Sequence, residues 1–141
     1  MYLIDTNVIS EYRKVPAGRA NQNVRNWVES QPVSLQFLSV IAIQELEVWA
    51  LRTERRDPAQ GLLMRRWLEA KVLSAFSDRI LNITPDVAVQ CAKLHVPDPK
   101  PDRDAFIAAT ALVYGLTVVT RNTADFAPMG VKLLNPWEPQ A

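Results

Sequence analysis

Four acidic side chains stand where a folded chain could gather them around a metal ion. These residues are Asp5, Glu45, Asp104 and Asp125, and each lies beside or within an apolar segment of the sequence. Converging carboxylates repel one another unless a cation joins them, and carboxylate oxygens are the ligands that Mg²⁺ and Mn²⁺ prefer. Such a cation most often serves phosphodiester hydrolysis. The four acids therefore predict a divalent-metal site of a phosphodiesterase.

Three of these acids also have plain structural explanations. Asp5 could cap the first helix, Asp104 could interact favourably with a helix dipole, and Asp125 could form a turn. Glu45 is harder to explain in this way, because a charge beside an apolar helix face needs a partner. Its neighbours at helical spacing are Ile41, Ala42, Val48 and Trp49. Glu47 points about 200° away around the helix, so we expect it to be solvated.

The elements that must position these acids alternate between strands and helices. Strands are predicted at residues 2–4, 35–40, 79–84, 117–120 and 131–134, and helices at 6–12, 21–30, 41–55, 58–76, 84–95 and 104–114. Residues 96–102 are proline-rich, and residues 121–125 are expected to form a loop. This order is typical of a parallel sheet covered on both faces, in which ligands bind at the carboxyl ends of strands. Asp5 and the loop at 121–125 lie at two such ends.

The helices at 41–55 and 58–76 are separated by Asp57-Pro58, which breaks the first of them and predicts a helical hairpin. The hairpin carries more apolar side chains than one sheet face needs. We therefore expect it to mediate self-association into a homodimer. No domain boundary or internal repeat is visible, so residues 1–141 are expected to form one domain.

Bulk charge gives no sign of a nucleic-acid binder. Sixteen basic residues face fifteen acidic ones, for a net charge of +1, so any contact with RNA or DNA must be local. Local basic clusters exist at residues 52–56 and 65–66, and they fit a solvated helix face as well as a binding surface. A membrane is not expected as a partner, since no apolar run approaches about 20 residues.

The remaining composition favours a reducing cytoplasm. Cys91 is the single cysteine, so no disulfide can form within the chain and a thiolate metal site is excluded. The first residues lack the basic and apolar regions of a secretion signal. The single histidine, His95, has no nucleophile motif to serve, and we expect it to lie outside the site.

Five segments, taken together and in order, resemble the motifs of PIN-domain ribonucleases of the VapC/FitB toxin type. They are residues 3–10 (LIDTNVIS), 38–46 (LSVIAIQEL), 104–111 (DAFIAATA), 116–126 (LTVVTRNTADF) and 134–137 (LNPW). The resemblance covers nearly the whole chain. It implies an α/β fold of the PIN type, a three-layer α/β/α sandwich with a central, mostly parallel sheet and a protruding helical hairpin.

The resemblance also implies a function. Proteins of this family are Mg²⁺- or Mn²⁺-dependent endoribonucleases that act as toxins, each with an antitoxin partner. An antitoxin would cover the hairpin groove and insert a basic side chain among the acids. Promoter DNA would be contacted only indirectly, through the antitoxin. A noncatalytic PIN-fold module that binds RNA or protein is the alternative. A phosphatase with an Asp pair after the first strand is disfavoured, because Asn7 stands at the second position.

Residue by residue, the resemblance assigns four acids and several polar companions. The acids are Asp5, Glu45, Asp104 and the more variable Asp125, and the companions are Thr6, Asn7, Thr120 and Asn122. Asp102 lies two residues before the third acid and could compete with it, although the motif spacing favours Asp104. Arg121 could bind a substrate phosphate or pair with a surface acid, and both alternatives remain open.

Overall fold

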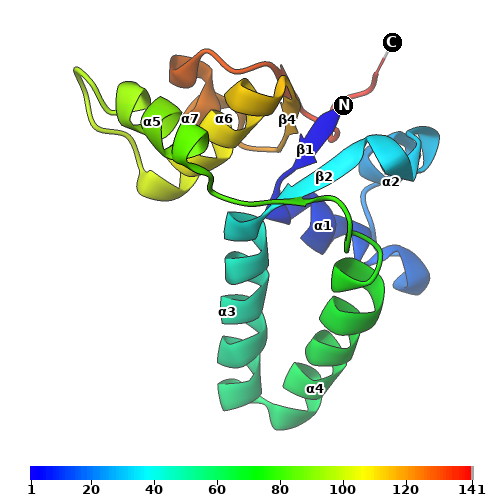
Figure 1. Cartoon of the computed structure of the whole chain (residues 1–141). Helices are drawn as coiled ribbons and strands as arrows, with labels where there is room; N and C mark the ends of the chain where they lie inside the picture. The colour runs from blue at the N-terminus through cyan, green and yellow to red at the C-terminus, as the bar shows by residue number, and fades with distance from the viewer. Residues whose placement is uncertain (141) are drawn as a thin grey trace.

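The computed structural model describes residues 1–140 and contains a parallel sheet with helices on both faces (Figure 1). Its five strands are β1 (Tyr2–Ile4), β2 (Gln36–Ser39), β3 (Ile80–Leu81), β4 (Thr117–Val119) and β5 (Leu133–Leu134). Their order is β3-β2-β1-β4-β5, and each neighbouring pair is parallel. After β1 the chain adds β2 and β3 on one side of it, and later adds β4 and β5 on the other side. The carboxyl ends of β1 and β4 therefore flank the place where open α/β sheets bind ligands.

Seven α-helices cover the sheet. They are α1 (Thr6–Tyr12), α2 (Gln22–Ser30), α3 (Val40–Arg56), α4 (Pro58–Trp67), α5 (Pro85–Leu94), α6 (Asp102–Tyr114) and α7 (Thr123–Phe126). Short 3₁₀ turns lie at Val15–Ala17, Val33–Leu35 and Ala127–Met129, and a π-helical turn at Leu68–Leu73 continues α4. No helix within residues 1–140 is long and apolar enough to cross a membrane.

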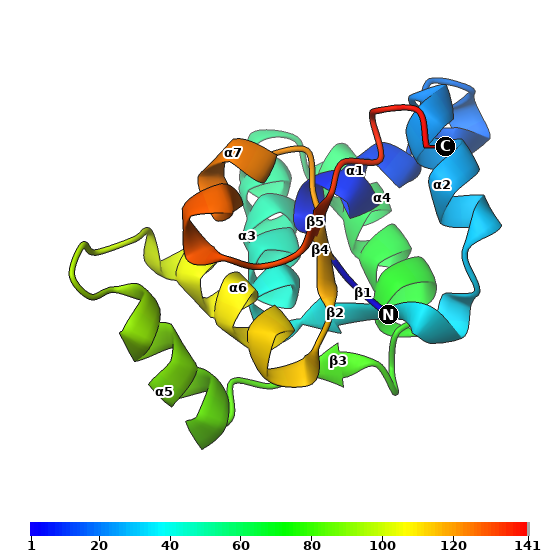
Figure 2. The same ribbon diagram turned by 90° about the horizontal axis from the view of Figure 1, so that it is seen from above.

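Alternation along the central strands divides the core between the two faces of the sheet. Figure 2 shows α5 and α6 on one side of the strands and α2 and α4 on the other. Leu3 and Val118 pack with side chains of α5 and α6 on one face. Ile4 and Val119 pack with side chains of α1, α2 and α3 on the other. Because successive strand residues point to opposite faces, both layers depend on the register that pairs Leu3 with Val118. The result is the predicted α/β/α arrangement.

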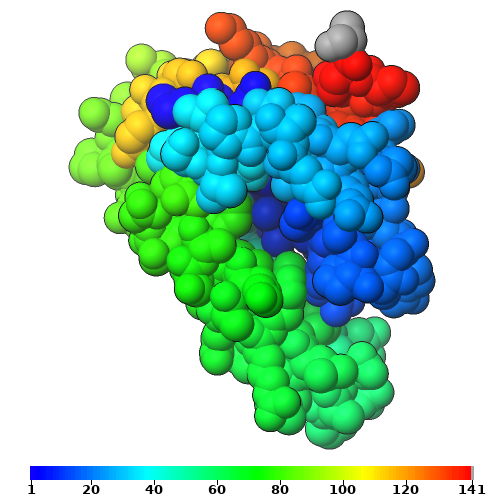
Figure 3. Space-filling view, turned by 90° about the vertical axis from the view of Figure 1, so that its right-hand side faces the viewer, coloured from blue at the N-terminus to red at the C-terminus, as the bar shows by residue number. Residues whose placement is uncertain are grey.

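Helices α3 and α4 form the predicted hairpin, which projects away from the sheet (Figures 1 and 3). Asp57 ends α3 and caps α4 by accepting a hydrogen bond from the Gln60 backbone N at 3.2 Å. Glu47 is not simply solvated as expected, because both of its carboxylate oxygens accept hydrogen bonds from Arg65 Nη1 at 2.6 and 2.7 Å. This ion pair joins the two arms of the hairpin.

Element boundaries differ from the expectations, and three of the differences change the type or the extent of an element; elsewhere the bounds shift by two residues or fewer. The helix predicted over 58–76 widens into the π-helical turn after Trp67, which keeps Leu68 and Val72 buried. The strand predicted over 79–84 is only Ile80–Leu81, an edge strand paired on one side. The loop predicted over 121–125 contains the start of α7. Each difference arises where packing, rather than the local apolar pattern, decides the backbone geometry.

Close helix packing in the hairpin depends on Gly61. A Cβ at this position would lie 2.7 Å from Glu54 Cβ and 2.8 Å from the Glu54 backbone N. We expect Gly61→Ala to lower the free energy of unfolding by about 1–3 kcal/mol, because overpacking outweighs the better helix propensity of Ala. Urea denaturation measures the change.

Gln60→Ala is the matched control for this prediction. Gln60 is the neighbouring residue and is exposed, so the control should change the free energy of unfolding by less than about 0.5 kcal/mol. A Gly61→Ala variant as stable as the control would show that α3 and α4 separate without cost.

Candidate active site

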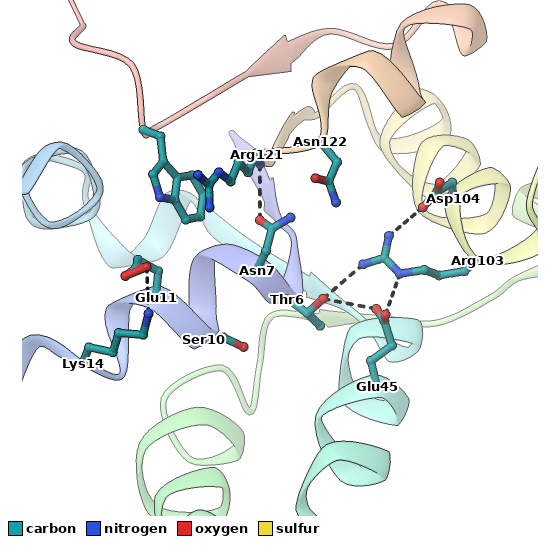
Figure 4. A pocket seen from close by; sticks show the side chains of 11 residues that line it. Thr6, Asn7, Ser10, Glu11, Lys14, Glu45, Arg103, Asp104, Arg121 and Asn122 are labelled. Carbon is teal, nitrogen blue, oxygen red and sulfur yellow. Dashed lines mark hydrogen bonds and ion pairs between the residues drawn. The ribbon is translucent and has the colours of Figure 1, made fainter. Parts of the chain in front are cut away.

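A pocket of about 520 Å³ lies at the carboxyl ends of β1 and β4 (Figure 4). Of the residues named from the sequence, its wall contains Thr6, Asn7, Glu45, Asp104, Arg121 and Asn122. It also contains residues that the sequence did not assign to the site, namely Ser10, Glu11, Lys14, Arg103 and Trp137. Helix α1 supplies one side of the pocket, while α3, α6 and the segment after β4 supply the others.

Asp5 is completely buried at the base of this site, directly after β1. Its backbone N donates to Val119 O at 2.9 Å, which extends the pairing of β1 with β4. Its carboxylate accepts hydrogen bonds from the Thr6 backbone N and from Thr120 Oγ1, both at 2.8 Å. The carboxylate of Asp5 therefore has both roles that the sequence suggested: it caps α1 and it belongs to the site.

The polar companions connect α1 to the segment after β4. Asn7 Nδ2 donates to Thr120 Oγ1 at 3.2 Å, and the Asn122 backbone N donates to the same oxygen at 3.0 Å. The Arg121 backbone N donates to Asn7 Oδ1 at 3.3 Å. Because Thr120 in turn donates to Asp5, this network fixes the direction of the buried carboxylate.

Glu45 reaches the same site from the second turn of α3. The helix begins after Ser39, whose Oγ accepts a hydrogen bond from the Ile41 backbone N at 3.0 Å. Glu45 is half-buried, and its Oε1 accepts a hydrogen bond from Thr6 Oγ1 at 3.3 Å. The charge beside an apolar helix face thus has the partner that its position requires.

The structure decides between Asp102 and Asp104. The Asp102 side chain is 88% exposed and lies 3.5 Å from His95 Nε2, whereas the Asp104 side chain is 13% exposed and lines the pocket. His95 is outside the pocket wall, and its Nδ1 accepts a hydrogen bond from the Lys100 backbone N at 3.1 Å. Asp104 is therefore the acid of α6 that belongs to the site.

Asp125 is not brought together with the other acids. It is exposed in the first turn of α7, where its backbone N donates to Asn122 O at 3.1 Å, and it is not part of the pocket wall. Arg121 does line the pocket, and its guanidinium lies 5.2 Å from the ring centre of Trp137. No acidic side chain within the described residues pairs with Arg121, so the alternative of a surface ion pair is not observed.

Among the site residues that sequence reasoning missed, Arg103 contacts all three acids. Its Nε donates to Glu45 Oε2 at 2.6 Å, its Nη1 donates to Asp104 Oδ1 at 2.6 Å, and its Nη2 donates to Asp5. Burial disfavours the charged guanidinium. The hydrogen bond to Glu45 and the charge of Asp5 outweigh that effect, so the pKa of Arg103 is raised above its ordinary value.

The sequence held one signal for Arg103, because it directly precedes the helix predicted to begin at residue 104, and a helix dipole disfavours a cation near its N-terminus. The structure places Arg103 in the first turn of α6. A basic residue at such a position needs carboxylate partners. Two of them, Glu45 and Asp5, are distant in sequence and are revealed only by the fold.

The donor set fits Mg²⁺ or Mn²⁺ in its chemistry. The three carboxylates at Asp5, Glu45 and Asp104 are hard oxygen ligands that share one binding partner, so they face a common small volume. Within residues 1–140, no three His, Cys, Asp or Glu side chains are close enough to one point to hold an ion unaided. To hold an ion, the three carboxylates would have to come closer together, and the guanidinium of Arg103 lies between them.

Comparisons with known proteins agree in pointing to one family. The sequence model of the PIN domain matches residues 2–131. VapC ribonuclease Y4jK of Sinorhizobium fredii is 34% identical over 99% of both chains. The crystal structure of FitAcB from Neisseria gonorrhoeae matches with a TM-score of 0.88 and 32% identity, over 97% of this chain and 99% of that one. A toxin–antitoxin complex from Klebsiella pneumoniae matches with a TM-score of 0.65 and 28% identity, over 98% and 99%.

The buried hydrogen bond between Thr120 and Asp5 provides a test of the site's architecture. Thr120→Val removes the donor to Asp5 and the acceptor for two N–H groups while keeping the side-chain shape. We expect the free energy of unfolding to fall by about 1–3 kcal/mol, since buried polar groups lose their partners.

Thr117→Val, at the start of β4, is the matched control. Thr117 is only half-buried, and its substitution touches none of the hydrogen bonds of the site. Equal stability of the two variants in urea denaturation would contradict the role given to Thr120.

Proposed function

The chain belongs to the PIN domain family, and from this premise we propose that it is a metal-dependent endoribonuclease and the toxin of a toxin–antitoxin pair. The family resemblance and the α/β fold class predicted from the sequence are both confirmed. The observation that carries the proposal is the meeting of Asp5, Glu45 and Asp104 around Arg103, at the carboxyl ends of the strands. The ribonuclease name of the relative from S. fredii supports RNA as the substrate.

The proposed cofactor is Mg²⁺ or Mn²⁺, with Asp5 and Asp104 as direct ligands and Glu45 as a ligand or a partner through water. Asp125 would act only through water, since it is exposed in the first turn of α7 and is not among the three acids that pair with Arg103. When bound, such a cation supplies an activated water and stabilises negative charge on phosphate oxygens. The structure supports this assignment by the oxygen-only donor set.

The polar side chains of the pocket have separate roles in this proposal. Thr120 and Thr6 hold the carboxylate of Asp5 in one orientation, and Asn7 fixes Thr120. In metal sites, hydrogen bonds from surrounding residues orient the ligands in this way. Arg121 and Asn122 lie at the side of the pocket formed after β4, where a guanidinium supported by Trp137 is available to a phosphate oxygen.

Cleavage by water determines the chemistry of the product ends. Attack by water at phosphorus, with departure of the 3′ oxygen of the preceding ribose, leaves a 5′-phosphate and a 3′-hydroxyl. A mechanism that uses the 2′-hydroxyl would leave a 2′,3′-cyclic phosphate instead. His95, the single histidine, is outside the pocket wall, so it is not proposed as a general base.

The proposed partners are an antitoxin and a second copy of this chain, both in the cytoplasm. The K. pneumoniae match is a toxin–antitoxin complex, which supports the antitoxin. Leu51, Leu62 and Leu63 of the hairpin are each about half exposed, which supports an additional interface there. Promoter DNA remains an indirect partner through the antitoxin.

The homodimer is tested by mass. Light scattering at micromolar concentration should give twice the chain mass for the isolated protein. A monomeric mass would contradict the homodimer while leaving the nuclease proposal untouched.

The nuclease is tested by cleavage of a pool of tRNA, rRNA fragments and single-stranded DNA with Mg²⁺, Mn²⁺ or EDTA. We expect RNA cleavage with metal only, and a loss of more than about 100-fold in Asp5→Asn and Asp104→Asn, because losing a ligand costs more than losing its support. Mass spectrometry of the fragments should find 5′-phosphates.

Asp102→Asn is the matched control, since it removes an exposed carboxylate two residues from Asp104 and should cleave like the wild type. Equal cleavage by wild type and both site variants would overturn the proposal and favour a noncatalytic module that binds RNA or protein. Cyclic phosphate ends would reject the attacking water but keep the nuclease.

A further inference from the structure

Arg103 occupies a position that a purely structural ion pair would not require. One guanidinium spans three carboxylates that come from β1, α3 and α6, so a single positive charge faces three negative ones. Its Nη2 also donates to Thr6 Oγ1 at 3.1 Å. The side chain is nevertheless 30% exposed and forms part of the pocket wall, so it has a path into the pocket.

We propose that Arg103 is a displaceable positioning residue: it holds the three carboxylates together as an internal cation and leaves them when a divalent metal ion binds. This inference rests on the proposed function, because it concerns the same carboxylates. It assigns the chain's own arginine to the place among the acids where the sequence analysis expected a basic side chain from a partner.

The carboxylates also have supports other than Arg103. Asp5 is fixed by Thr120 and by the backbone of Thr6, and Glu45 stands on a long helix whose start is capped. Asp104 lies in the first turn of α6, where the helix dipole favours its negative charge. Arg103 is therefore not the sole support of the site. It neutralises part of the repulsion within a site that other contacts also support.

Charge decides the competition between Arg103 and a metal ion. Three carboxylates attract a doubly charged ion more strongly than a singly charged one at similar distances. Arg103 gives up its hydrogen bonds when it leaves, so its presence must weaken metal binding. The displaced guanidinium stays at the pocket wall, where its planar fork can bind two oxygens of a phosphate.

The test measures the affinity of the metal-free, full-length protein for Mn²⁺ by electron paramagnetic resonance of the free ion. Arg103→Gln should bind Mn²⁺ at least about tenfold more tightly than the wild type, because the competing cation is gone. Arg103→Lys should lie between the two, since one ammonium cannot reach three carboxylates in the way a guanidinium does.

Thermal unfolding adds a second readout. In EDTA, Arg103→Gln should have a lower Tm than the wild type, because the carboxylates repel one another unopposed. On addition of Mn²⁺ its Tm should rise by more than that of the wild type, as tighter binding to the folded state requires. A residue that only braces the fold would lower the Tm without tightening the binding of Mn²⁺.

Lys14→Gln is the matched control, because it removes a positive charge from the same pocket wall. Lys14 pairs with Glu11 at 3.1 Å and has no hydrogen bond to the three carboxylates. Its loss should change the Mn²⁺ affinity by less than about twofold at physiological salt, where exposed charges are screened. A larger change would show that general electrostatics, and not contact, governs the affinity.

The outcomes separate this inference from the proposed function. If the wild type binds Mn²⁺ and both Arg103 variants bind it equally or more weakly, Arg103 is a fixed brace and the inference is overturned. If Arg103→Gln does not fold, Arg103→Lys decides alone, and unchanged affinity rejects the inference. If no protein binds Mn²⁺, wild type included, both the inference and the proposed metal dependence fail.

Discussion

Electrostatic repulsion among carboxylates is the constraint on which the site depends. Parallel strands bring their carboxyl ends to one edge, and there Asp5 meets acids carried by α3 and α6. A fold selected for stability alone would not bury Asp5 completely beside Glu45 and Asp104. The arrangement persists because neutral donors, above all Thr120, orient Asp5 and because Arg103 supplies charge. The polar groups around the acids are thus needed to keep the acids together.

Much of the fold was predictable because its causes are local. Apolar runs followed by polar residues indicate β1, β2 and β4, and Asp57-Pro58 marks the turn of the hairpin. The three acids that meet in the pocket were also predictable, since each stands at the end of a strand or on a helix with an apolar face. The boundary after Trp67 was not, because a π-helical turn arises from packing against the core and has no distinct apolar period.

Arg103 escaped prediction because its partners are distant in sequence. Arg103 has its meaning only through Asp5 and Glu45, which are 98 and 58 residues away in sequence. Nothing beside Arg103 in the chain specifies those partners, although a cation in the first turn of a helix is a local irregularity. Asp125 presents the opposite case. Its motif suggested a fourth acid at the site, but in the first turn of α7 the residue is exposed to solvent.

The structure also separates the fixed and the movable parts of the site. Asp5 is held by the pairing of β1 with β4 and by buried hydrogen bonds, so its position is set by the sheet itself. Arg103 is a long side chain, partly exposed, on the first turn of α6. A change of cation at this site therefore requires movements of side chains, that of Arg103 above all, and no rearrangement of strands. Packed cores resist small displacements, whereas exposed side chains change rotamer readily. The exchange of Arg103 for a metal ion therefore involves the movable side chain and leaves the sheet unchanged.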